Sequence, residues 1–171
     1  MNRTRRSCLA LLAVPLLLAS LPSTAFAGPP WISIETPVNP YDPTTRGAFL
    51  MVHAYHHGTP VSIPVTGVAE GIVNGERRTV TLRFTKTSNP GVYALANQWG
   101  AEGDWSLVIT VAENPDNMAQ ALVQVSDGRV LSVAVPTTRG RDGMTIPRRL
   151  TKAEILASLR DRSTRVATYK P

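Results

Sequence analysis

The feature that most constrains the fold of this chain is the recurrence of large apolar residues at every second position of two short segments, 79–85 and 105–111. In the first segment, Val80, Leu82 and Phe84 alternate with threonine and arginine. In the second, a tryptophan, a leucine, an isoleucine and a valine take the alternate positions. A period of two with one apolar face is the pattern of a β-strand that covers a core on one side. Both segments are therefore predicted to be core strands of a β-sandwich.

Six further segments have the composition of short strands: residues 31–35, 48–56, 67–73, 92–98, 119–126 and 129–135. Asn74-Gly75 and Asp127-Gly128 each lie between two of the predicted strands, and such dipeptides accept the positive φ angles of a tight hairpin turn. Three prolines predict an ordered surface loop over residues 36–46. About eight short strands separated by turns indicate an all-β fold. We expect an Ig-like antiparallel β-sandwich with an extra hairpin at Asp127-Gly128 and one short C-terminal helix.

The N-terminus has the pattern of a secretory signal peptide. Three arginines and no acidic residue precede an apolar run over residues 8–18, and Ala25-Phe26-Ala27 follows it. The run contains Pro15 and is shorter than the roughly 20 residues that a spanning helix needs, although an uncleaved anchor is the alternative. We expect residues 1–27 to be a signal peptide. The mature protein would then begin at Gly28 and be periplasmic or secreted, without stable membrane insertion.

Cysteine content and charge exclude several classes of function. The single cysteine, Cys8, lies inside the predicted signal peptide, so the mature protein would contain no disulfide, thiolate nucleophile or cysteine metal ligand. The chain has a net charge of +6. Residues 28–140 hold seven basic and nine acidic residues, whereas residues 141–171 hold eight basic and three acidic residues. A nearly neutral body and the predicted export both argue against nucleic-acid binding.

The C-terminal region is predicted to contain a linker and then a helix. Two glycines and two prolines over residues 136–149 indicate a linker. Thr151 and Glu154 then have the spacing of a capping box, and Leu150 and Ile155 that of a hydrophobic staple. The resulting division of the chain is a signal peptide (1–27), a sandwich (28–138), and a basic linker with a short helix (about 151–161) and a flexible tail (139–171).

Part of the chain also carries a family resemblance. The matching pieces are the predicted strand 48–56, Gly58-Thr59-Pro60-Val61, Pro90-Gly91-Val92-Tyr93, and residues 103–111. With these pieces, the stretch from about residue 46 to 111 resembles the Ig-like periplasmic domains of the YtkA-like and FixH-like kind. In such a fold Gly91 permits a close approach, and the Tyr93 hydroxyl can lock a corner. The resemblance implies an Ig-like fold and the accessory role that such domains often have in metal trafficking or respiratory assembly, although a fold alone does not imply a function.

All three histidines fall within five residues, close to a methionine. The candidate metal ligands are Met51, His53, His56 and His57. Imidazole suits copper and zinc, and a thioether favours Cu(I). On a straight strand His53 and His57 would lie about 13 Å apart, so chelation requires the strand to end near His56, or a carboxylate from Glu102 or Asp104. The alternative is a strand end whose polar residues simply face solvent.

No catalytic motif is present. The chain lacks G-x-S-x-G, H-E-x-x-H and a glycine-rich phosphate loop, and we therefore expect no enzyme. Four aromatic residues are candidates for either a recognition surface or core packing; they are Trp31, Tyr41, Tyr55 and Trp99.

The basic C-terminal region is the predicted contact with a partner, which would be an unknown protein of the cell envelope. Its contact residues are Arg148, Arg149, Lys152, Ile155, Leu156, Leu159 and Arg160. Docking of the helix on its own domain is the competing interpretation, since a helix of about ten residues is marginal in water. We expect an exported, non-catalytic binding or accessory module without a cofactor. The alternative is a periplasmic copper- or zinc-binding domain that uses the cluster from His53 to His57.

Overall fold

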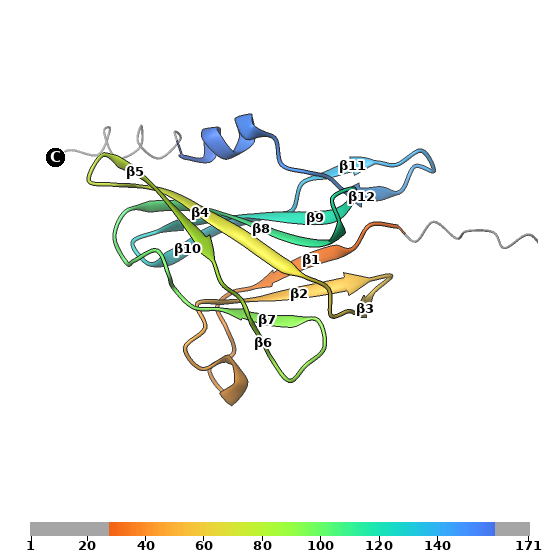
Figure 1. Ribbon diagram of the computed structural model, residues 1–171, viewed down its shortest axis with the longest axis horizontal. Helices are drawn as coiled ribbons and strands as arrows, with labels where there is room; N and C mark the ends of the chain where they lie inside the picture. Colours follow the sequence, from red (N-terminus) through yellow and green to blue (C-terminus); the bar gives the residue numbers. More distant parts are fainter. Residues whose placement is uncertain (1–27, 160–171) are drawn as a thin grey trace, which may run out of the picture.

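The protein is an all-β sandwich with one short C-terminal helix, as the sequence predicts (Figure 1). The computed structural model describes residues 28–159. Two antiparallel sheets enclose one apolar core, to which both sheets contribute buried side chains. Among the described residues no helix is long and apolar enough to cross a bilayer.

The first sheet has the strand order β1-β2-β7-β6, with β3 paired to β2. Its strands are β1 (Trp31–Glu35), β2 (Leu50–His56), β3 (Thr59–Pro60), β6 (Thr85–Lys86) and β7 (Val92–Leu95). The register of β1 and β2 places Trp31 opposite Tyr55. Between these strands, the predicted surface loop is ordered and contains a single 3-10 turn, η1 (Pro43–Thr45).

The second sheet has the strand order β10-β9-β8-β4-β5. Its strands are β4 (Val65–Val73), β5 (Glu76–Leu82), β8 (Asp104–Asn114), β9 (Asn117–Ser126) and β10 (Arg129–Ala134). All eight predicted strands are therefore present, with ends shifted by a few residues. Both predicted hairpin turns are confirmed, since φ is 52° at Asn74, 82° at Gly75, 47° at Asp127 and 70° at Gly128.

The apolar side chains at alternate positions of the predicted strands form the core. Trp105 and Ile109 of β8 are 2% and 0% exposed and point inward. The Trp105 Nε1 donates a hydrogen bond to the backbone oxygen of Glu102 at 2.9 Å. Tyr93 locks a corner as expected, because its hydroxyl donates to the backbone oxygen of Ile63 at 2.5 Å.

The C-terminal helix covers residues 152–159 of the described chain and lies against the outer face of the second sheet (Figure 1). The predicted capping box is confirmed: the Thr151 nitrogen donates to Glu154 Oε2 at 2.8 Å, and the Glu154 nitrogen donates to Thr151 Oγ1 at 3.2 Å. Ser158 Oγ is 2.8 Å from Ser106 Oγ of β8, and both residues are buried. The predicted helix end near residue 161 and the predicted tail lie outside the described residues.

The predicted linker at 136–149 is instead a hairpin of β11 (Thr137–Arg139) and β12 (Thr145–Pro147). Its glycines serve the turn, since Gly143 has a φ of 79° and the Gly140 nitrogen donates to the oxygen of Met144 at 2.7 Å. The predicted domain boundary between residues 138 and 139 therefore falls inside β11. Figure 1 shows the hairpin at the end of the molecule where the chain enters β1.

Candidate functional site

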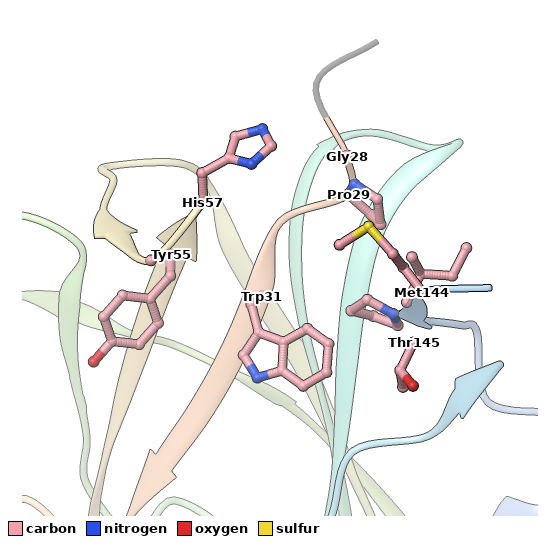
Figure 2. A pocket seen from close by; sticks show the side chains of 10 residues that line it. Gly28, Pro29, Trp31, Tyr55, His57, Met144 and Thr145 are labelled. Atoms are coloured by element: carbon pink, nitrogen blue, oxygen red, sulfur yellow. The ribbon is translucent and has the colours of Figure 1, made fainter. Parts of the chain in front are cut away.

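An open cleft of about 470 Å³ lies between the β11–β12 hairpin and the adjoining ends of β1 and β2 (Figure 2). Its ten lining residues are Gly28, Pro29, Trp31, Tyr55, His57, Gly58, Met144, Thr145, Ile146 and Pro147. We call it the aromatic cleft. Its size falls within the range of about 300–1,000 Å³ that is typical of ligand sites.

The first sheet supplies the aromatic wall. Ile32 and Ala54 point into the core, so the period of two turns Trp31 and Tyr55 to the outer face. They lie opposite each other in the β1–β2 register. The chain turns after β2 at His57, whose φ is 49°, and this turn brings the exposed His57 to the rim of the cleft.

The hairpin supplies the aliphatic wall. Figure 2 shows Met144 and Thr145 across the cleft from Tyr55 and His57, with Trp31 between the two sides. Met144 is 64% exposed and Trp31 is 39% exposed. The lining contains no carboxylate, lysine or arginine. Such a cleft can bind an apolar or aromatic group by burial and ring contact. It has no carboxylate to orient His57 for acid–base chemistry.

A second, more polar cavity of about 620 Å³ adjoins the aromatic cleft, and Gly28, Pro29, Ile146 and Pro147 line both. The remainder of its lining is Asn114, Pro115, Asp116, Asn117, Met118, Arg148 and Arg149. We call it the polar cavity. Together the two cavities form a groove that is apolar at one end and charged at the other.

The two arginines of the polar cavity have different partners. Arg148 forms a two-point ion pair with Glu154, with Nη2–Oε1 at 2.6 Å and Nη1–Oε2 at 3.0 Å. The Arg148 guanidinium, followed by the Thr151 backbone and hydroxyl, holds the pKa of Glu154 well below its usual range, and the same pair raises the pKa of Arg148. Arg149 Nη2 donates to the backbone oxygen of Pro115 at 2.9 Å.

The predicted metal ligands occupy four different environments. Met51 is 1% exposed. His53 Nε2 is 2.9 Å from Glu35 Oε2, and the His53 ring is parallel to Tyr55 with centroids 6.3 Å apart. His56 Nε2 is 2.7 Å from the backbone oxygen of Gly28. The rings of His56 and His57 lie 4.6 Å apart.

One condition for chelation is met, because β2 ends at His56 and the chain folds back at His57. The sequence suggests Glu102 or Asp104 as an additional carboxylate ligand, whereas the structure places Glu35 Oε2 at 2.9 Å from His53 Nε2. Within residues 28–159 no group of three His, Cys, Asp or Glu side chains is placed to hold a metal ion. Metal binding by this cluster stays a prediction.

Some of the predicted partner-contact residues pack against the protein itself, and others line the polar cavity. Leu159 is 5% exposed against the protein itself, so a partner could reach it only if the helix undocked. Ile155 and Leu156 are half-buried, and Lys152 is exposed. The two remaining described residues, Arg148 and Arg149, line the polar cavity. Arg160 lies outside the described residues.

Of the four candidate aromatic residues, the structure brings two together. Trp31 and Tyr55 share the aromatic cleft, whereas Trp99 is buried with its ring edge-on to Phe49. Tyr41 is 92% exposed in the proline-containing loop. The wall formed by residues 144–147 is not predicted by the sequence. The apolar Met144 and Ile146 within a glycine- and proline-rich stretch were the available signal.

No protein-family model, curated protein or solved structure matches the chain. These comparisons therefore neither support nor contradict the resemblance to YtkA-like and FixH-like domains.

Proposed function

We propose that the protein is an exported, non-catalytic binding module whose ligand occupies the aromatic cleft. The observation that carries this proposal is the placement of the exposed Trp31 and the half-buried Tyr55 opposite the exposed Met144, in a cleft whose lining has no carboxylate, lysine or arginine. Clustered exposed apolar residues on a small protein commonly mark an interaction site. Aromatic residues are also enriched among the residues that dominate binding energy.

The proposal of export rests on the N-terminal pattern of three arginines, an apolar run and Ala25-Phe26-Ala27. We place the mature protein in a periplasm or outside the cell, where an Ig-like accessory module would meet a protein of the cell envelope. The absence of a carboxylate from the lining of the aromatic cleft supports a non-catalytic role.

A titration of the protein that begins at Gly28 with indole and benzyl alcohol, followed by ¹H–¹⁵N NMR, tests this function. We expect saturable shifts that cluster at residues 31, 55, 57, 58 and 144–146, because these line the aromatic cleft. Trp31→Ala should abolish them. Leu131→Ala is the matched control, since Leu131 is a 60% exposed apolar residue outside the cleft. Shifts spread over the surface, or unchanged by Trp31→Ala, would overturn the proposal.

Metal binding is the second candidate, and the proximity of the His56 and His57 rings favours it. The backbone oxygen of Gly28 can only accept a hydrogen bond, so the proton of a neutral His56 lies on Nε2 and leaves Nδ1 free to ligate. Calorimetric titration with Zn(II), Cu(II) and Cu(I) tests this candidate. Saturable binding at micromolar concentration that His57→Ala abolishes would support it, and binding unaffected by His53→Ala and His57→Ala would remove it.

A further inference from the structure

The wall between the aromatic cleft and the polar cavity contains the residue that the predicted signal cleavage would turn into the N-terminus. Gly28 and Pro29 line both cavities. The Gly28 oxygen is held by His56 Nε2 at 2.7 Å, which fixes this residue on the end of β2. Cleavage after Ala27 would therefore create an α-ammonium group beside both cavities.

The charges that line the polar cavity nearly cancel before cleavage. Arg148 is neutralised by Glu154. Within the described part of the chain no carboxylate lies at ion-pair distance from Arg149, and Asp116 is the acidic lining residue. The positive charge of Arg149 and the negative charge of Asp116 therefore cancel in the net charge of the cavity lining. The α-ammonium of Gly28, with an ordinary pKa of about 7.7–8.0, would give the cavity a net positive charge.

We propose that the groove binds the C-terminal end of a peptide, with an apolar side chain in the aromatic cleft and the free α-carboxylate in the polar cavity. This inference rests on the proposed function and names its ligand class. Arg149 and the Gly28 ammonium supply the charge that the carboxylate requires. The two cavities share a wall only a few residues wide, which matches the short separation between the terminal carboxylate and the neighbouring side chains of a peptide.

A peptide fits the groove better than a fatty acid, which has the same carboxylate. The aromatic cleft is open, with Met144 64% exposed and Trp31 39% exposed. A long alkyl chain in such a cleft would keep much of its surface in water, whereas one or two apolar side chains would be covered. Cleavage of the signal peptide would then also complete the binding site.

Tryptophan fluorescence provides the readout. Trp31 is 39% exposed, whereas Trp99 and Trp105 are 7% and 2% exposed, so a ligand in the groove acts on the emission of Trp31. The probes are the peptide Ala-Ser-Gly-Leu-Val-Phe with a free carboxylate, the same peptide as the C-terminal amide, and decanoate. The protein begins at Gly28 and is used with its α-amine either free or acetylated.

We expect the free acid to bind at least about tenfold more tightly than the amide, as for the loss of a charge-assisted hydrogen bond. Arg149→Gln or acetylation of Gly28 should each weaken binding of the acid more than binding of the amide, and so reduce the preference for the acid. Arg141→Gln is the matched control, because Arg141 is an exposed arginine of the hairpin turn that lines neither cavity.

Equal binding of acid and amide would overturn the inference. If a ¹H–¹⁵N NMR titration then showed that Trp31→Ala abolishes this equal binding, the proposed function would stand without the inference. Tighter binding of decanoate than of the acid peptide would overturn the choice of a peptide. The absence of saturable binding by all three probes would overturn the inference as well, and the fragment titration at the aromatic cleft then decides the proposed function separately.

Discussion

The backbone nitrogen of Leu150 donates a 2.7 Å hydrogen bond to Oε1 of Gln120, and this buried contact joins the C-terminal segment to β9. Gln120 Nε2 in turn donates to Thr110 Oγ1 of β8 at 2.9 Å. Leu150 lies between the β11–β12 hairpin and the helix. The side chain of Gln120 therefore helps to position both the hairpin that walls the aromatic cleft and the helix that covers the second sheet.

Replacement of Gln120 by leucine should destabilise the protein by about 1–3 kcal/mol, because the Leu150 N–H would be left buried without an acceptor. Urea unfolding measures this change. Gln124→Leu is the control: Gln124 is on the same strand, but its Oε1 accepts from the exposed Ser132 hydroxyl. We expect it to change stability by about 0.5 kcal/mol or less. Equal losses of unfolding free energy for the two substitutions would show that the hydrogen bond to Leu150 contributes no more to stability than the exposed one.

Tyr93→Phe should cost about 1 kcal/mol of folding stability, since the hydrogen bond to the Ile63 oxygen is lost. Burial raises the pKa of the Tyr93 hydroxyl in the folded protein. The stabilisation of the folded protein by the protonated Tyr93 hydroxyl is therefore fully present below about pH 10, which is the pKa of a tyrosine in an unfolded chain. This stabilisation is lost as the pH rises further. Urea unfolding between pH 8 and pH 11 should show a smaller alkaline loss for Tyr93→Phe than for the exposed control Tyr41→Phe. Identical profiles would contradict this assignment.

Glu154→Gln should loosen the start of the C-terminal helix at neutral pH. The pKa of Glu154 is lowered by the hydrogen bonds from Arg148 and Thr151, so the stabilisation is present above about pH 4.3, the ordinary value for glutamate, and is lost as the pH falls below it. Amide hydrogen exchange of residues 155–159 measures the effect. The native protein should lose protection on acidification, and the variant should show little change. Glu113→Gln is the control, since it affects an exposed contact with Asn117. On acidification this variant should lose amide protection of the helix as the native protein does.

The sandwich could be predicted because its signals are local. The alternation around Trp105 selects the inward face of β8, and the Asn74-Gly75 and Asp127-Gly128 turns fix two hairpins. The capping box at Thr151 and Glu154 is likewise read from four consecutive residues and is confirmed. Each of these features depends on side chains close together in sequence.

The aromatic cleft could not be predicted in the same way, because it joins residues 28–31, 55–58 and 144–147. Its hairpin wall consists of two strands of three residues each, with exposed threonines at 137 and 138 and Pro147 at one end. Strands this short and polar show no alternation. On sequence alone the glycines at 140 and 143 indicate a linker, whereas in the structure they form the turn of a hairpin.

Reversible blocking of the aromatic cleft tests the central claim most directly. The chain from Gly28 onward contains no cysteine, so Met144→Cys introduces a single thiol, which can carry thionitrobenzoate as a mixed disulfide. Leu131→Cys with the same adduct is the control, since Leu131 is exposed outside the cleft. The measurement is the binding of indole, followed by NMR, before and after reduction of the adduct. We predict that the adduct at position 144 abolishes binding, that reduction restores it, and that the adduct at position 131 has no effect. Unchanged indole binding with the cleft blocked at position 144 would contradict the account.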